Sequence, residues 1–228
     1  MGGVLVLTLL PDGPYLKGRA HFDARMLWRV FRHQQFRHAA FGYFGHMWEL
    51  YAFWSMVSFF LAARLEGAAL SWQGWLPLLS FATIGVGSLG CALGGMCSKR
   101  IGEKTVASTS LWVSGIMCLL SGFIYKLDLL PLVLLILVWG FFVVSDSPQF
   151  SALAARYCPP EYTGTALTVQ NGIGFAITVA SIQIIPWVAE TIGWRWTFLP
   201  LGIGPLIGLY FVSRLPCDIA RDQCVSGQ

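Results

Sequence analysis

The chain contains a succession of six long apolar segments joined by short polar connections, and this pattern limits its fold more than any other feature. The segments cover about residues 39–63, 74–97, 105–125, 129–155, 163–188 and 196–213. Each is long enough to cross a bilayer as a helix, which takes roughly 20 residues. Only 11% of the 228 residues are charged, whereas soluble domains average about 25%. The sequence therefore predicts an all-α membrane protein with six transmembrane helices.

The positions of the basic residues predict how these helices are oriented. If the helices alternate in direction, twelve of the fifteen Lys and Arg residues fall on one side of the membrane. The other side receives only Arg64, Lys126 and Arg195. Since short loops rich in Lys and Arg stay in the cytoplasm, we expect both termini to be cytoplasmic in a multi-pass protein of the plasma (inner) membrane. Basic residues between apolar segments form no nucleic-acid surface, so no such partner is expected.

The segments that flank the bundle have different characters. Residues 1–14 begin with an apolar run too short to span a bilayer, and we expect them to be the remnant of a preceding transmembrane helix. Residues 15–38 are basic, with apolar residues at helical spacing, which predicts an amphipathic linker on the cytoplasmic surface. Residues 39–214 form the predicted bundle, and residues 215–228 a cytoplasmic tail.

Two carboxylates lie at matching depth in different segments. Glu49 lies about ten residues into a helix that leaves the cytoplasm, and Asp146 about ten residues before the end of one that returns. At a rise of 1.5 Å per residue, both are about 15 Å from the inner boundary. A charge at this depth costs roughly 2.5–3.5 kcal/mol and therefore faces a cavity or a partner. We expect the two carboxylates to share one polar site.

Each carboxylate also has a purely structural interpretation. In that interpretation, Glu49 is satisfied by a neighbouring helix and contributes only to helix packing. Asp146 lies two residues before Pro148, and short polar side chains often satisfy the backbone groups that a proline in a membrane helix leaves unbonded. Asp146 would then serve a kink in the fourth helix.

The other polar residues of the segments extend the candidate site. His46 lies three residues before Glu49 on the same helix face, where it either exchanges a proton with the carboxylate or only satisfies it. Because loss of water favours the neutral form of a carboxyl group, Glu49 is predicted to couple transport to protons. Together with Asp146, the amides of Gln149, Gln170 and Asn171 are expected to line a substrate path; the alternative is that they hydrogen-bond between helices.

No motif in the sequence predicts an enzyme, a cofactor or a metal site. Gly85 to Gly90 match G-x-G-x-x-G inside an apolar segment, without the strand and helix that a dinucleotide site needs. Gly85, Gly87, Gly90 and Gly94 instead predict close helix contacts, and Gly90 and Gly94 form a GxxxG pair. Ser114 has no histidine base on a late helix, since His46 is the only histidine in any segment. The six cysteines show no metal-ligand spacing and are expected to be free thiols that fill small gaps.

The loop after the second segment carries a pattern of glycines and charges. Residues 95–104 read Gly-Met-Cys-Ser-Lys-Arg-Ile-Gly-Glu-Lys, which resembles the major facilitator superfamily loop motif G-x-x-x-D-R-x-G-R-[RK]. The matching residues are Gly95, Arg100, Gly102 and Lys104. Lys99 stands in place of the usual acid and Glu103 in place of the usual arginine, so the charge latch between helix ends is weakened or reversed.

Two further stretches, residues 159–165 and 193–198, resemble the loops that flank the eleventh helix of the same family. The resemblance covers most of residues 11–214 and implies that the chain is the C-terminal half of a twelve-helix fold. In that family the first and fourth helices of each half line the central cavity. Here these are the helices that carry Glu49 and Asp146.

The resemblance implies a secondary active transporter of a small solute, with no cofactor. Its partners are the lipid bilayer, the solute, and either an N-terminal six-helix half or a second copy of the chain, because alternating access arises between two such halves. In this interpretation Glu49 and His46 handle a coupling proton. The alternative is a truncated, non-transporting fragment, or a membrane subunit that requires a partner half.

Overall fold

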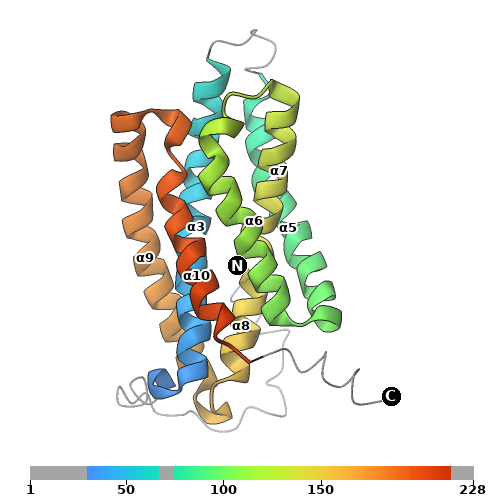
Figure 1. Ribbon diagram of the computed structural model, residues 1–228, viewed down its shortest axis with the longest axis vertical. Helices are drawn as coiled ribbons and strands as arrows, with labels where there is room; N and C mark the ends of the chain where they lie inside the picture. Colours follow the sequence, from blue (N-terminus) through green and yellow to red (C-terminus); the bar gives the residue numbers. More distant parts are fainter. Residues whose placement is uncertain (1–29, 67–73, 217–228) are drawn as a thin grey trace, which may run out of the picture.

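The computed structural model describes residues 30–66 and 74–216, and every regular element in these ranges is helical. The long elements lie along one another in an elongated bundle (Figure 1). They are α3 (Gln34–Leu65), α5 (Leu76–Ile101), α6 (Glu103–Ile124), α7 (Leu129–Ser145), α8 (Ser147–Arg156), α9 (Thr163–Ile192) and α10 (Ile203–Ser213). The all-α prediction is confirmed for these ranges, whereas residues 1–14, most of the 15–38 linker and most of the 215–228 tail lie outside them.

Two of the predicted helices are built from shorter pieces. The fourth segment, predicted as one helix over residues 129–155, is divided between α7 and α8 at Asp146. The sixth segment starts with two 3-10 turns, η2 (Trp194–Trp196) and η3 (Leu199–Gly202), before α10 begins. A third short turn, η1 (Pro160–Tyr162), precedes α9. Proline near the start of α8, η1 and η3 explains these beginnings, because it lacks a backbone N–H that a continuing helix would need.

Among the residues that the structure describes, five candidate membrane spans have the length and apolar composition that a membrane crossing requires. They cover residues 76–101, 103–124, 129–156, 160–192 and 194–213. The first predicted segment, in α3, is not among them, so six transmembrane helices are not established by composition. The reason lies in its position: α3 buries 18 of its 32 residues, whereas α5 buries 5 of 26. A helix enclosed by other helices meets little lipid and tolerates polar side chains.

The packing repeats between the first three and the last three helical segments. In one group are α3, α5 and α6, and in the other α7 with α8, α9 and α10. The second helix of each group packs against the first helix of the other, since α5 lies on α7 and α9 lies on α3. Likewise α6 packs on α7 and α8, while α10 packs on α3. Equivalent contacts in two successive three-helix units are the mark of an internal repeat.

Glycines allow the closest of these contacts. A methyl group added to Gly45 of α3 would overlap the carbonyl oxygen of Gly204 and lie 2.8 Å from the amide nitrogen of Gly208, both on α10. Between α5 and α7, a methyl group on Gly90 would overlap the carbonyl oxygen of Phe141, and one on Gly94 would lie 2.8 Å from that of Ser145. The close helix contact predicted for the glycines of α5 is thus confirmed at Gly87, Gly90 and Gly94. It is wrong at Gly85, where a methyl group would meet only Phe81 of the same helix, at 3.9 Å.

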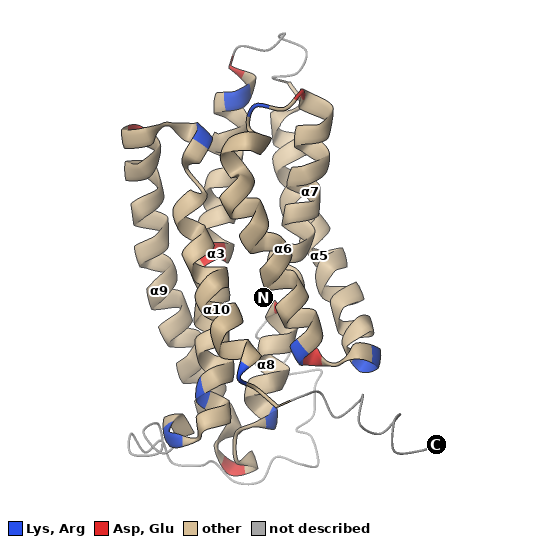
Figure 2. Cartoon of the chain, viewed as in Figure 1, with Lys and Arg blue, Asp and Glu red and all other residues tan. Residues whose placement is uncertain are grey.

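Charged residues concentrate at the two ends of the bundle (Figure 2). The end formed by the start of α3 and the end of α10 carries Arg37 and Arg214, and we call it the basic end. At the opposite end, Arg64 donates from Nε to the carbonyl of Tyr125 at 2.9 Å, and Arg195 donates from Nε to that of Gly122 at 2.9 Å. Both arginines therefore satisfy carbonyls that the end of α6 leaves without a helical partner.

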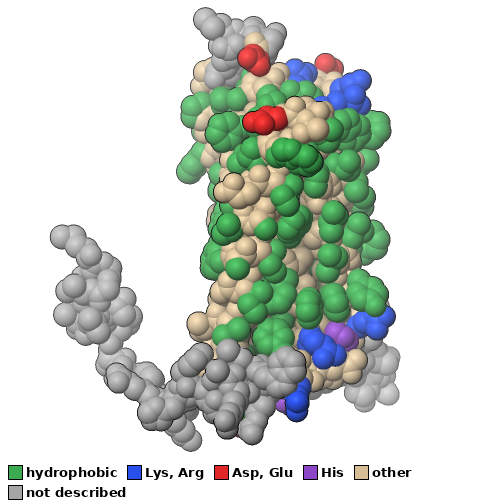
Figure 3. Space-filling model, turned by 90° about the vertical axis from the view of Figure 1, so that its left-hand side faces the viewer, with side chains coloured by type: hydrophobic (Ala, Val, Ile, Leu, Met, Phe, Trp, Pro, Cys, Tyr) green, Lys and Arg blue, Asp and Glu red, His purple; other side chains and the backbone are tan. Residues whose placement is uncertain are grey.

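Between these ends the outer surface is apolar. Figure 3 shows hydrophobic side chains over most of one face, with Lys and Arg side chains at both ends of it and histidine near the lower end. Large side chains stand outward on several helices, among them Phe81 and Leu130, which are 74% and 72% exposed. Water would make such a surface costly, whereas the hydrocarbon of a bilayer would not.

Candidate functional site

Glu49 lies in the interior of the bundle, where three helices meet. Its side chain is on α3 and the residue is only 1% exposed. The carboxylate Oε1 accepts a hydrogen bond from Trp139 Nε1 on α7 at 2.9 Å, and another from Cys118 Sγ on α6 at 3.3 Å. An interior carboxylate needs such donors to offset its lost hydration. Sequence reasoning missed both donors, because Trp139 and Cys118 look like ordinary apolar residues of their segments.

Packing of aromatic rings fixes the donor from Trp139. Its ring centroid lies 4.6 Å from that of Phe53 and 5.3 Å from that of Phe198, and all three residues are at most 1% exposed. The indole therefore has a single orientation, with Nε1 directed to Glu49. This arrangement gives α3, α7 and the turns before α10 a common contact at the site.

His46 lies beside Asp146 rather than beside Glu49. Its Nδ1 is 2.9 Å from Asp146 Oδ1, and both side chains are 2% exposed. The distance is that of an ion pair, although among the described residues Oδ1 has no partner with hydrogen-bonding angles, and His46 Nε2 has none at all. The spacing of His46 and Glu49 predicts that they share a face of α3, but it does not predict which residue the imidazole contacts. The imidazole points instead to the break between α7 and α8.

The side chain of Asp146 does not serve the kink in the way that the structural interpretation required. Asp146 separates α7 from α8, and Pro148 lies in the first turn of α8. Its side chain makes no capping hydrogen bond to α8, whereas its backbone carbonyl accepts from the amide of Phe150 at 3.0 Å. The main chain thus continues through the break without help from the carboxylate, which is directed to His46.

These three groups form one cluster, which we call the acid–imidazole cluster: Glu49, His46 and Asp146. The two carboxyl groups are close enough to interact electrostatically. Rings of Tyr43 and Phe150 lie beside the imidazole, with centroids 6.0 and 5.8 Å from it. Titratable groups from two chain segments are therefore brought together in surroundings where water has little access.

The other predicted path residues differ in their surroundings. Gln149 is 2% exposed and donates to the Ser145 carbonyl of the preceding turn at 3.5 Å, which places it next to the α7–α8 break. Gln170 is fully buried, and neither of its amide atoms has a hydrogen-bond partner among the described residues. Asn171 is exposed and directed outward from α9. Gln149 is therefore the predicted path residue that the structure brings to the same helix break as Asp146.

The loop motif at the basic end holds helix ends together. Gly102 ends α5 with a φ of 88°, and its amide donates to the Ser98 carbonyl at 2.9 Å. Lys104 donates from Nζ to the Ser213 carbonyl at the end of α10, at 3.3 Å. Glu103 accepts from Arg156 Nη2 at 2.6 Å. The unusual acid at position 103 thus forms an ion pair with α8, which agrees with a reversed charge latch, while Arg100 is exposed.

Replacing Gly102 by alanine is expected to lower the midpoint of thermal unfolding in detergent by about 2–12 °C, since a side chain at this φ and ψ costs about 1–3 kcal/mol. Gly95 provides a matched control in the same motif. It lies within α5 with no atom near its missing side chain, so Gly95→Ala should leave the midpoint unchanged or raise it. Equal losses in both variants would contradict this assignment.

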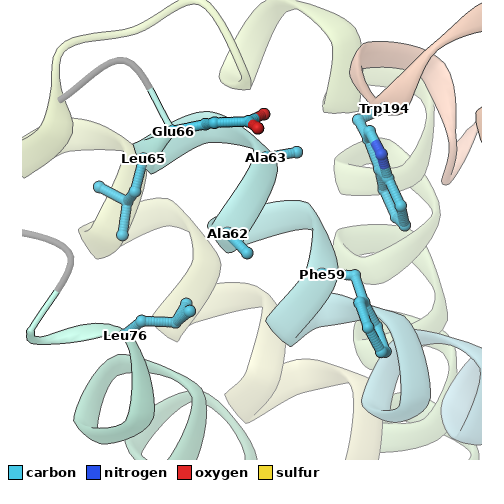
Figure 4. A pocket seen from close by; sticks show the side chains of 7 residues that line it. All are labelled: Phe59, Ala62, Ala63, Leu65, Glu66, Leu76 and Trp194. Carbon is cyan, nitrogen blue, oxygen red and sulfur yellow. The ribbon is translucent and has the colours of Figure 1, made fainter.

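A separate hollow of about 420 Å³ opens at the end opposite the basic end (Figure 4). It lies between the end of α3, the start of α5 and η2, and Glu66, Phe59 and Trp194 stand around it. None of the predicted site residues lines it. The hollow is therefore distinct from the acid–imidazole cluster.

An elongated all-helical bundle with an apolar outer surface, an internal three-helix repeat and a buried cluster of titratable groups has the architecture of a membrane transport protein. The family model of the Major Facilitator Superfamily matches residues 39–220, and the chain belongs to this family. The resemblance seen in the loop motif is thereby confirmed. The matched relatives are transporters, which supports the expectation that the chain is not an enzyme.

Several characterised proteins are similar to parts of the chain. The probable galactarate/D-glucarate transporter GudP of Escherichia coli is 26% identical over 113 residues, which are 48% of this chain and 25% of GudP. The 4-hydroxybenzoate transporter PcaK of Acinetobacter baylyi is 27% identical over 153 residues, which are 67% of this chain and 33% of PcaK. The chain thus matches a quarter to a third of the length of these relatives.

A solved structure supports the fold. The xylose transporter XylE from E. coli, in an inward open conformation, aligns with 84% of this chain at a TM-score of 0.56. The aligned part is 48% of the XylE chain, and the sequences are 17% identical. At this identity the likeness shows the fold and not the substrate.

Proposed function

We propose that this chain is the C-terminal six-helix half of a secondary active transporter that moves a small solute with a coupled proton. The observation that carries the proposal is the acid–imidazole cluster, in which Glu49, His46 and Asp146 are buried together inside a bundle of the transporter family. Ionisable residues within membrane spans mark ion or substrate pathways by default. The aligned half of XylE supports the proposed half-transporter architecture.

Glu49 is proposed to bind the coupling proton. When Glu49 is ionised, its Oε1 holds donors from α7 and α6, namely Trp139 and Cys118. Protonation removes the charge, and a neutral acceptor forms weaker hydrogen bonds than an ionised one. Proton binding would therefore loosen the contact of α3 with α6 and α7. In this way a local proton equilibrium biases the packing of helices that must move during alternating access.

His46 and Asp146 are proposed to complete the proton site. The imidazole is held by Asp146 through Nδ1, and its Nε2 is left to exchange a proton. Because Asp146 Oδ1 lies 2.9 Å from Nδ1, the carboxylate orients the imidazole at the site. Asp146 would thus act on proton coupling as well as on the substrate path.

The substrate path is proposed to include Asp146, Gln149, Gln170 and Asn171. Gln170 supports this assignment, because a buried amide without partners among the described residues is costly unless a ligand or water satisfies it at some stage. The named relatives are a probable galactarate/D-glucarate transporter and a 4-hydroxybenzoate transporter. Small organic acids are therefore the first substrates to test. The partner half would supply any basic side chain that binds the carboxylate of the substrate.

We propose further that all six segments, α3 included, cross the plasma membrane with the basic end in the cytoplasm, as the positive-inside rule requires. The partner would be an N-terminal six-helix half or a second copy of the chain. A tag at the C-terminus and a blot of native membranes would distinguish these arrangements: a species about twice the mass of this chain contains both halves in one polypeptide. A species of the mass of this chain requires a separate partner.

The transport proposal is tested by uptake. Everted or right-side-out vesicles that contain the native assembly are given radiolabelled D-glucarate, galactarate and 4-hydroxybenzoate, with and without an imposed pH gradient. We expect at least one acid to accumulate only when the gradient is present, and a protonophore to abolish its accumulation. Uptake that follows the solute gradient alone, with no response to pH, would refute proton coupling while keeping a transport role.

Changing Trp139 to phenylalanine tests the donor to Glu49. Phenylalanine keeps a ring between Phe53 and Phe198 but removes Nε1, so a hydrogen bond to a charged group, worth about 1.5–3 kcal/mol, is lost. We expect gradient-driven uptake to fall by roughly tenfold or more while most of the protein remains folded. Trp112→Phe is the matched control, because Trp112 is 57% exposed on α6. Unchanged uptake in Trp139→Phe would show that this bond has no part in coupling.

A further inference from the structure

An apolar groove of about 410 Å³ runs along the bundle between α9 and α10, with α3 as its floor. Figure 1 shows α9 and α10 at one edge of the molecule, away from α5 and α7. Most of its wall is aromatic or branched and comes from two helices. On α3 these residues are Phe41, Phe44 and Trp48, and on α10 they are Ile203, Ile207 and Phe211.

The shape of the groove follows from glycine contacts described above. Gly45 and Gly204 bring the backbones of α3 and α10 together and leave no side chain in the groove wall. Phe41 and Phe211 close one end with stacked rings, whose centroids are 4.7 Å apart. At the other end Trp48 donates from Nε1 to the Pro200 carbonyl at 3.2 Å, so that its polar atom is satisfied and its ring faces the groove.

The length of the groove corresponds to one leaflet of a bilayer. Phe211 and Ile203 lie eight residues apart on α10, which at 1.5 Å per residue is about 12 Å. The hydrocarbon core of a bilayer is about 30 Å thick, so one leaflet contributes about 15 Å. The groove therefore extends over most of one leaflet, starting near the basic end.

Cationic side chains stand just beyond the groove at the basic end. Arg37 lies one turn before Phe41 on α3, and Arg214 lies three residues after Phe211, with its guanidinium 4.5 Å from the centre of the Tyr210 ring. Both arginines are exposed, and among the described residues neither forms an ion pair with a carboxylate. They lie about one helical turn, roughly 5 Å, outside the apolar part.

His38 joins the two arginines. It is in hydrogen-bonding contact with the backbone of Arg214 and lies within electrostatic reach of both guanidinium groups. Although the residue is only 7% exposed, its Nδ1 has no hydrogen-bond partner among the described residues. Three nitrogen-bearing side chains thus converge where a lipid headgroup would lie.

We propose that this groove binds one anionic phospholipid from the leaflet at the basic end, with an acyl chain along Phe44 and Ile207 and the phosphate between Arg37 and Arg214. Basic pockets between membrane helices bind anionic headgroups, and each cation near the membrane surface adds about a fivefold gain in affinity. This site is separate from the acid–imidazole cluster and goes beyond the transport proposal. It requires only that the bundle is embedded in a membrane.

Charge argues against a second copy of the chain as the occupant. In a two-fold dimer the same patch meets itself, which would place Arg37 and Arg214 of one copy against the same residues of the other. Juxtaposed like charges disfavour such a contact. A free phosphate would satisfy the arginines but would leave the apolar groove unfilled.

Native mass spectrometry of the purified assembly tests the proposal with three probes: phosphatidylglycerol, phosphatidylcholine with identical acyl chains, and soluble glycerol phosphate. We expect phosphatidylglycerol to be retained preferentially and glycerol phosphate not to bind. In the double variant Arg37→Gln/Arg214→Gln, the preference for phosphatidylglycerol over phosphatidylcholine should fall by roughly 25-fold. Ile207→Trp should fill the groove and reduce binding of both phospholipids.

Matched controls separate this site from general effects of charge and bulk. Arg100→Gln removes an exposed arginine at the same end, and Leu206→Trp adds a ring on a part of α10 that does not line the groove. Both should retain lipid as the unmodified protein does. The proposal is overturned if the test variants bind as the controls do, or if glycerol phosphate competes fully. It is also overturned if Ile207→Trp converts a dimer of this chain to monomers.

Discussion

Replacing Glu49 by glutamine is expected to abolish proton-driven accumulation of substrate, with exchange of substrate across the membrane largely intact. Glutamine keeps the size of the side chain and its Oε1 acceptor, so the hydrogen bonds from Trp139 and Cys118 remain possible. It cannot ionise, and the site then holds one charge state throughout the transport cycle. The measurement is uptake against a gradient beside counterflow in vesicles preloaded with substrate.

The matched control for this variant is Glu190→Gln. Glu190 is an exposed carboxylate near the end of α9, so its loss changes the net charge by the same amount without touching the cluster. We expect this control to accumulate substrate normally. If Glu49→Gln accumulates substrate against a gradient as the control does, the proposed coupling role of Glu49 is refuted, whatever the substrate is.

Gly45→Leu is expected to cause the largest loss of folded protein of any change considered for this chain. The neighbours of a side chain at this position are backbone atoms of Gly204 and Gly208, which cannot move aside as a flexible side chain does. Overpacking costs about 1–3 kcal/mol even where side chains can adapt, so the separation of α3 from α10 should cost at least that much. We expect the yield of monodisperse protein in detergent to fall by about tenfold.

Gly172→Leu serves as the control for this substitution. Gly172 also lies within a long helix, α9, but no atom lies within 4 Å of its missing side chain. Leucine there should leave the folded yield unchanged or raise it slightly, since glycine is a poor helix former. Equal yields for the two leucine variants would mean that the contact of α3 with α10 is looser than its glycines indicate.

Much of the fold could be predicted from the sequence, because one effect, the transfer of apolar residues out of water, determines where a chain spans a membrane. The interruptions of the helices within the spans were harder to predict from the sequence. Pro148 predicted a kink, and the structure places a division between α7 and α8 two residues earlier. The 3-10 turns before α10 depend on Pro200 and on the packing of Trp196 against Gly122, which no local pattern reveals.

The sequence predicts which residues belong to the candidate site, but it does not predict which of them contact one another. Depth along each helix identified Glu49 and Asp146, since rise per residue is nearly constant. Partners across helices depend on the rotation of each helix about its axis, which tertiary packing determines. For this reason His46 could be placed on the face of Glu49 but not next to Asp146. Likewise nothing in the sequence distinguished Trp139 from the other tryptophans.

The hydrogen bonds that Arg64 and Arg195 donate to carbonyls at the end of α6 restrict how the bundle can bend. Arg64 comes from the last turn of α3 and Arg195 from the turn before α10, and both are fastened to carbonyls at one helix terminus. These hydrogen bonds connect α3, α6 and the turn that carries Arg195 at the end opposite the basic end. We expect this end of the bundle to move as a rigid body. Bending of the helices is then expected elsewhere. The interruption between α7 and α8 at Asp146, beside the imidazole of His46, is not held by these hydrogen bonds.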